Sequence, residues 1–138
     1  MIYSYTTSPQ TVAVDDNVVF TIDEIKTGCT VTHAAGTPTF VFNKPGYYYV
    51  TFNGVASATA AATDPITAEL YNGTVAIPGA LSSALSAAID TPVTLSIGTI
   101  IQVRPNCPAI DNTVNLVVKN VGIEANYTNV TITITKLC

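Results

Sequence analysis

One long segment of the chain, residues 40–62, alternates between apolar and polar side chains. From Tyr48 onward the even positions are apolar and the odd positions are mostly amphipathic or polar. The even positions are Val50, Phe52, Gly54, Ala56, Ala58 and Ala60, and the odd positions are Tyr47, Tyr49, Thr51, Asn53, Ser57 and Thr59, with Val55 as the exception. A period of two predicts a β-strand whose two faces differ in chemistry. We therefore expect one face to cover a hydrophobic core and the other to meet a partly polar neighbour.

Shorter runs rich in β-branched and aromatic residues, which favour strands, occupy most of the remaining chain. They are residues 2–5, 11–14, 18–22, 29–33, 37–42, 66–71, 74–77, 91–97, 99–104, 114–121 and 126–136. Turn-forming residues separate them, and Asn72-Gly73 is a strong hairpin signal. Residues 78–90 place leucines and alanines at helical spacing, but serines there compete for backbone hydrogen bonds, so we expect an irregular or extended segment. About ten short antiparallel strands without a convincing helix predict an all-β sandwich.

The chain carries little charge for its size. Only 10% of its 138 residues are Asp, Glu, Lys or Arg, whereas a typical soluble chain has roughly 25%. Hydrophobic residues make up 48%, yet no run approaches the roughly 18 unbroken apolar residues of a membrane span. Uncharged surface of this extent favours burial at a subunit interface, so we expect an oligomer. The net charge of −4 and the scattered lysines argue against nucleic-acid binding.

The N-terminus and the cysteines bear on where the protein acts. The first residues, MIYSYTTSPQ, have no basic region followed by an apolar one and do not form a classical secretory signal. We expect them to form an extended N-terminal arm, residues 1–10, ahead of one domain at residues 11–138. Cys29, Cys107 and Cys138 are too few for a disulfide scaffold, and their number is odd. Independent thiols are the expected state without a signal peptide, and one Cys29–Cys107 bridge is the alternative.

Residues able to carry catalysis or bind a metal are sparse. His33 is the single histidine, and no G-x-S-x-G motif accompanies it. Cys29 shares its strand face but lies about 13 Å away at 3.3 Å per residue, too far to share one metal ion, so we expect both residues to be structural. Asp64, Asp90 and Asp111 lie in predicted loops without the D-x-D-x-D run of a calcium site. We therefore expect no enzymatic activity, no cofactor and no metal.

The central segment carries a recognisable motif. Phe40, five residues and then GYYYVTF at 46–52 are similar to the F-x5-G-x-Y-x-F-x-[FY] pattern of the globular heads of the complement q-subcomponent and its relatives, with Val50 where that family prefers Phe. Residues 92–101 resemble the family's v-x-L-x-x-G-D-x-V segment. Residues 129–137 resemble the final strand of its bacterial and phage branch. These heads belong to the tumour-necrosis-factor-like jelly-roll superfamily, and the resemblance extends over most of the chain.

This resemblance implies a ten-stranded antiparallel jelly roll that assembles as a homotrimer, with the central and C-terminal strands at the three-fold axis. By analogy, the trimer interface would comprise Tyr47, Tyr49, Thr51, Thr131, Thr133 and Thr135. The sandwich would be filled by Tyr48, Val50, Phe52, Val130, Ile132 and Ile134. Tyrosine suits an interface because it buries a large area while its hydroxyl still finds a partner. The alternative is that Tyr47 and Tyr49 lie on an exposed face under a loop.

Jelly rolls of this kind serve as extracellular ligands, spore-surface heads and knobs on phage particles, so the fold alone does not select a function. A start at Met1 close to the first strand, without a collagen-like repeat or a signal peptide, favours the phage particle. The expected function is a structural virion surface protein: a head-decoration, head-fibre or tail-tip knob assembled in the host cytoplasm. Residues 1–10 would dock on other virion proteins, and the loops would meet a host-surface glycan or protein. The alternative is a trimeric binding head on a bacterial or spore surface.

Overall fold

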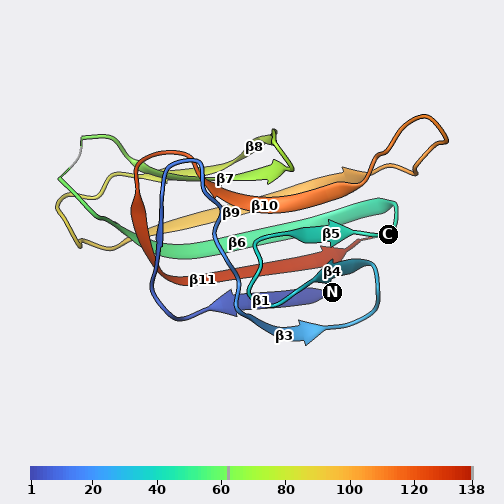
Figure 1. Ribbon diagram of the computed structural model, residues 1–138, viewed down its shortest axis with the longest axis horizontal. Helices are drawn as coiled ribbons and strands as arrows, with labels where there is room; N and C mark the ends of the chain where they lie inside the picture. The colour runs from blue at the N-terminus through green and yellow to red at the C-terminus, as the bar shows by residue number, and fades with distance from the viewer. Residues whose placement is uncertain (62, 138) are drawn as a thin grey trace.

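The chain folds into two antiparallel β-sheets packed face to face (Figure 1). The computed structural model describes residues 1–61 and 63–137. None of these residues lies in a helix, so none forms a membrane-spanning helix. The strands are β1 (Ile2–Thr6), β2 (Gln10–Val12), β3 (Ile22–Lys26), β4 (Val31–His33), β5 (Phe40–Phe42), β6 (Gly46–Ala58), β7 (Ile66–Asn72), β8 (Val75–Ala84), β9 (Val93–Val103), β10 (Val114–Asn120) and β11 (Ala125–Lys136). The first sheet has the order β3-β1-β11-β6-β9 with β2 beside β11, and the second has the order β4-β5-β10-β7-β8. The predicted all-β sandwich is confirmed.

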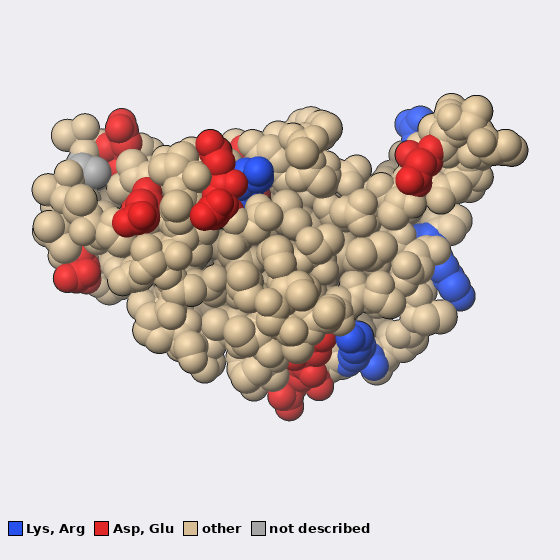
Figure 2. Space-filling model, in the orientation of Figure 1, with Lys and Arg blue, Asp and Glu red and all other residues tan. Residues whose placement is uncertain are grey.

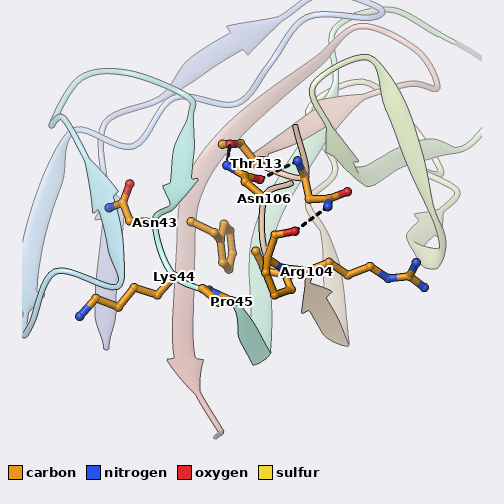
Figure 3. Close-up of a pocket in the computed structure, with 10 residues that line it drawn as sticks. Asn43, Lys44, Pro45, Arg104, Asn106 and Thr113 are labelled. Carbon is orange, nitrogen blue, oxygen red and sulfur yellow. Dashed lines mark hydrogen bonds between the residues drawn. The ribbon is translucent and has the colours of Figure 1, made fainter. Parts of the chain in front are cut away.

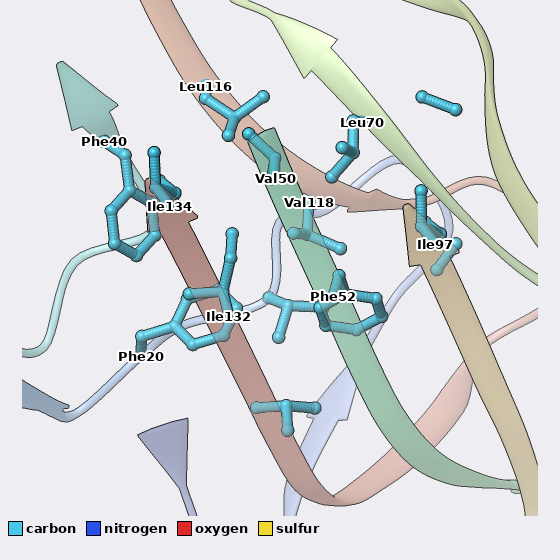
Figure 4. Packing of buried hydrophobic residues seen from close by; sticks show 14 of the residues in the cluster. Phe20, Phe40, Val50, Phe52, Leu70, Ile97, Leu116, Val118, Ile132 and Ile134 are labelled. Atoms are coloured by element: carbon cyan, nitrogen blue, oxygen red, sulfur yellow. The ribbon is translucent and has the colours of Figure 1, made fainter. Parts of the chain in front are cut away.

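Strand β6 organises the sandwich, as the alternation in the sequence predicted. It spans 13 residues and pairs with β11 on one side and β9 on the other. The residues predicted to fill the sandwich are all buried: Tyr48, Val50, Phe52, Val130, Ile132 and Ile134 (Figure 4). Phe20, which lies outside the named strands, packs against Phe40 with ring centroids 5.4 Å apart and the rings at 71°. One core therefore joins the two sheets.

Several strand boundaries differ from the predicted ones. Strand β8 continues to Ala84 because it pairs along β7, so the first part of the ambiguous segment 78–90 is a strand. Strand β9 is continuous where two separate runs were expected, since Gly98 pairs with Thr51 in the middle of β6. The β7–β8 hairpin is confirmed, but its loop consists of residues 73–74, one position later than predicted. Gly73 supplies the positive φ of 60° that this loop requires.

The N-terminal segment is an integral part of the first sheet, which corrects the predicted arm at residues 1–10. Strand β1 pairs with β11 along one edge and with β3 along the other. Its alternate residues Ile2, Ser4 and Thr6 are buried. Because both edges of β1 are occupied, it has no free edge to add to the sheet of a neighbouring molecule. Docking of residues 1–10 on another virion protein stays a prediction, and strand addition by β1 would require the loss of one of these pairings.

A buried polar contact ties β2, β10 and β11 together. Asn120 and Tyr127 are both fully buried. The Asn120 amide nitrogen donates to the Val12 carbonyl at 3.0 Å and to the Ile123 carbonyl at 2.8 Å. The Tyr127 hydroxyl donates to Asn120 Oδ1 at 3.0 Å, and burial raises the pKa of that hydroxyl. One amide side chain on β10 thus satisfies groups on β2, on β11 and in the β10–β11 connection.

Candidate functional site

The residues predicted to form an interface lie together on the outer face of the first sheet, the face turned away from the core. They are Tyr47, Tyr49, Thr51, Thr131, Thr133 and Thr135, and none of them is buried. They belong to the adjacent strands β6 and β11, where Thr51 pairs with Thr133 and Tyr49 pairs with Thr135. The structure therefore brings all six onto one continuous surface, which we call the outer face.

The outer face extends beyond these six residues. One row of paired residues crosses five of the six strands of the sheet: Ile25, Tyr3, Thr133, Thr51 and Gly98. Ile100 and Gln102 on β9 extend the face past Tyr49 and Tyr47. The alternation of residues 2–6 would have indicated that Tyr3 and Tyr5 share a face. No local signal places them beside β11, because that pairing joins the two ends of the chain.

Along β1, β11, β6 and β9 the outer face consists of aromatic, apolar and uncharged polar side chains, and Glu24 of β3 contacts its edge at the Tyr5 hydroxyl. No Asp, Glu, Lys or Arg is among the outward-pointing residues along β1, β11, β6 and β9. Tyr47, Tyr49 and Ile100 are 47%, 45% and 59% exposed. The Gln102 amide donates to the Tyr47 hydroxyl at 3.2 Å. Such a surface loses little on dehydration and retains hydrogen-bonding groups, so it is chemically suited to contact with another protein surface.

A polar cluster lies where β3 of the first sheet approaches β4 of the second. His33 Nδ1 lies 2.5 Å from Asp23 Oδ1, and His33 Nε2 lies 2.8 Å from the Thr37 carbonyl oxygen. The Ser4 hydroxyl donates to Asp23 Oδ1 at 2.6 Å. The Phe40 ring stacks on the imidazole with centroids 4.1 Å apart. Both ring nitrogens of the imidazole are therefore occupied by contacts within the protein.

This cluster has the geometry of a structural contact. His33 is 4% exposed and uses both ring nitrogens, while Ser4 contacts the Asp23 carboxylate and not the imidazole, so the Ser–His contact of an activated serine is absent from this cluster. Cys29 was predicted to be a structural residue. It lies in the exposed connection before β4, and the thiols of Cys29 and Cys107 are both free. Cys138 lies outside the described residues.

The aspartates considered for calcium do not form one site. Asp64 and Asp90 lie in connections at one end of the sandwich, whereas Asp111 lies in the β9–β10 connection at the other end. Within residues 1–61 and 63–137, no three His, Cys, Asp or Glu side chains are grouped so that they could hold a metal ion. The outer face is therefore the best-supported candidate site among those that the sequence indicated.

Acid should weaken the polar cluster. Burial alone would raise the pKa of Asp23, but hydrogen bonds from Ser4, His33 and Lys26 outweigh it and hold the pKa below the ordinary aspartate value. Because the folded pKa is lowered, the stabilisation is present above about pH 4 and is lost as the pH falls through the folded pKa. We expect Asp23→Asn to lower the free energy of unfolding by about 2 kcal/mol at neutral pH. It should also flatten the acid dependence of stability in urea denaturation.

The matched control for this prediction is Glu24→Gln. Glu24 is the adjacent, exposed carboxylate and makes only a 3.5 Å contact with the Tyr5 hydroxyl. Its neutralisation should leave the acid profile close to that of the wild type. Identical acid profiles for Asp23→Asn and the wild type would show that the cluster does not contribute to the pH dependence of stability.

Comparison with known proteins identifies the fold. No protein-family model and no curated protein matches the chain. Among solved structures, the chain is similar to Eiger TNF from S. frugiperda, with a TM-score of 0.68 at 13% sequence identity over 99% of this chain and 92% of that one. The chain has the TNF-like jelly-roll fold. It is also similar to PRD1 vertex protein P5, with a TM-score of 0.58 at 14% identity over 99% of this chain and 96% of that one.

The TNF-like jelly roll confirms the resemblance seen in the sequence at the level of fold. Both similarities cover 99% of the chain, so the N-terminal strand β1 belongs to the matched architecture. At these identities the likeness concerns the fold alone, since one fold can carry many functions. The function must therefore be argued from the outer face and from the loops of this TNF-like jelly roll.

Proposed function

We propose that this chain is a structural surface protein of a phage virion and that it assembles as a homotrimer through the outer face. The uncharged outer face carries the proposal, because a free protomer would leave tyrosine and isoleucine side chains half exposed there. A vertex protein, PRD1 P5, has the same fold over nearly the whole chain, which supports a virion setting. The proposal includes no enzymatic step and no cofactor.

Trimerisation through the outer face fits the rest of the molecule. The inward residues of β6 and β11 already fill the core, so only their outward residues remain to contact a second copy. Charged residues make up 10% of the chain, and the outward positions along the four strands β1, β11, β6 and β9 lack them. A closed ring of identical copies buries the same surface on each protomer. The loops at both ends of the sandwich remain open for contacts with the particle and with the host.

The position on the particle would be a head-decoration, head-fibre or tail-tip knob. Since β1 is paired on both edges, attachment to the particle would use a loop end of the sandwich. The loops at the opposite end would then face outward toward a host-surface glycan or protein. A trimeric binding head on a bacterial or spore surface would use the same interface, so the outer face does not separate these two settings.

The virion role is tested on purified particles. We expect quantitative mass spectrometry to find this chain in intact particles in multiples of three copies, and antibody-gold electron microscopy to mark one site. Label on the head would identify a decoration or head-fibre protein, and label at the tail end would identify a tip knob. Recovery of the chain only in cell-surface or spore-coat fractions would replace the virion proposal with the binding-head alternative.

A further inference from the structure

A cleft opens at one end of the sandwich between two connections that are distant in the sequence (Figure 3). One wall is the β5–β6 connection, and the other is formed by the two ends of the β9–β10 connection. The lining residues are 42–45, 103–106 and 112–113, and the cleft volume is about 340 Å³. Sites for small ligands span roughly 300–1,000 Å³, so the cleft has room for a sugar-sized group.

The lining combines apolar rings with amides. Pro45 and Pro105 provide exposed apolar surface above the buried Phe42, and three asparagines provide polar groups. The Asn112 amide nitrogen donates to the Pro105 carbonyl at 2.8 Å, and that of Asn43 donates to the Cys29 carbonyl at 3.2 Å. Among the described residues, nothing donates to the Oδ1 atoms of these two asparagines, so they remain available to accept from ligand hydroxyls. A sugar ring has an apolar C–H face and a rim of hydroxyl groups, so apolar surface beside amide acceptors can contact both.

The cleft lies at the cationic end of a molecule whose charge is otherwise acidic. Strand ends and connections at this end carry four of the five cations in the sequence: Lys26, Lys44, Arg104 and Lys136. Connections at the opposite end carry five of the nine carboxylates: Asp15, Asp16, Asp64, Asp90 and Glu124. Lys26 is paired with Asp23, and Asp111 lies in the β9–β10 connection at the cleft end. Figure 2 shows blue and red groups at the cleft end and red groups at the opposite end. An anionic ligand is therefore favoured at the cleft end over the opposite end.

Two of these cations belong to the cleft itself. Within the described residues, neither Lys44 nor Arg104 forms an ion pair, since the ion pairs there all involve Asp23. Asp111 is the carboxylate in the adjacent loop, and its Oδ1 accepts from the Thr113 backbone amide at 2.9 Å. Hydrogen bonds from Thr113 hold the pKa of Asp111 below its ordinary value, so it is ionised and directed to its own loop. Lys44 and Arg104 thus remain available for an external anion.

The positions of the two cations indicate the shape of the ligand. In Figure 3, Lys44 and Arg104 leave opposite rims of the cleft and their charged ends point away from each other. A single small anion would contact one of them, whereas a chain with repeated acidic groups would contact both. The Arg104 rim is held in place because Asn106 Oδ1 accepts from the Asn112 backbone amide at 2.7 Å. A rim that is ordered before binding reduces the entropy lost on binding.

We propose that this cleft binds an acidic carbohydrate chain, with a sugar ring in the cleft and the flanking carboxylate or phosphate groups on Lys44 and Arg104. The cleft lies at an end of the sandwich, between β5 of one sheet and β9 of the other. The inference deepens the proposed function and rests on it for the setting, since it names the class of host-surface ligand that the virion protein would meet.

Isothermal titration calorimetry with a galacturonate oligosaccharide tests the proposal. We expect the oligosaccharide to bind more tightly than galacturonate itself, and affinity to fall as salt is added. A neutral gluco-oligosaccharide of the same length should not bind. Lys44→Gln and Arg104→Gln should each weaken binding about 3- to 10-fold, and the double variant should weaken it more than about 10-fold. Lys119→Gln removes the same charge from β10, outside the cleft, and should retain wild-type affinity.

Three results would overturn the cleft assignment. They are equal binding of the neutral and acidic oligosaccharides, full affinity in the double variant, and no binding of either the galacturonate or a glycerol-phosphate oligomer. Preference for the glycerol-phosphate oligomer, which has no sugar ring, would overturn the placement of a ring in the cleft. Light scattering on the same samples reports assembly separately: a trimer without saccharide binding contradicts only the cleft, and a saccharide-binding monomer contradicts only the trimer.

Discussion

A Tyr49→Arg variant should be a single chain in light scattering, whereas the wild type should have the mass of three chains, about 43 kDa from a 14.4 kDa protomer. Tyr49 lies on the outer face, on β6 between its partners Thr135 on β11 and Ile100 on β9. An arginine there would bring three like charges toward one axis and remove them from water. Burial of an unpaired charge costs several kcal/mol, which lowers the association constant by more than about 100-fold.

The matched control for this variant is Leu81→Arg. Leu81 is 50% exposed on β8 of the second sheet, and Tyr49 is 45% exposed on the first, so both substitutions place an arginine on a half-exposed strand. Leu81→Arg should remain trimeric, and Tyr49→Arg should keep the circular dichroism of a β-protein because its side chain is outside the core. A monomeric wild type, or a trimer that persists in Tyr49→Arg, would contradict the interface assignment.

An Asn120→Ala variant should be destabilised by about 3 kcal/mol or more, because the substitution leaves the buried Tyr127 hydroxyl and the Val12 and Ile123 carbonyls without their partner. For a chain of this length, such a loss lowers the melting temperature by roughly 10 °C. Urea denaturation at a fixed protein concentration measures the loss, since subunit association contributes to apparent stability. Tyr127→Phe removes only one of the hydrogen bonds and should cost about 1 kcal/mol.

The control for the buried amide is Asn126→Ala. Asn126 lies on β11, and its Oδ1 accepts a hydrogen bond from the exposed Thr11 hydroxyl at 2.6 Å. Removal of this amide leaves a hydroxyl that water can satisfy, so the free energy of unfolding should fall by no more than about 0.5 kcal/mol. Equal destabilisation of Asn120→Ala and Asn126→Ala would show that the buried contact has no special role in holding the three strands together.

The sequence by itself determined the fold class and the division of the central strand into two faces. In a strand, successive side chains point to opposite sides, so the alternation from Tyr48 to Ala58 determines which residues face the core before any partner is known. The same holds for Val130, Ile132 and Ile134 on β11. The absence of charge at the odd positions of the central strand could also be read from the sequence, because it follows from the residue types and from a period of two.

Only the tertiary structure decided which strands lie side by side. The local sequence of β1 predicts only an extended N-terminal segment. Its place between β3 and β11 depends on pairing with residues that are distant in the sequence. The extra residues of the outer face, the environment of Asn120 and the cleft beside Lys44 and Arg104 depend on such contacts as well. Strand pairing and loop packing in a jelly roll join segments remote in sequence, and a local pattern determines the direction of a side chain without specifying its neighbours.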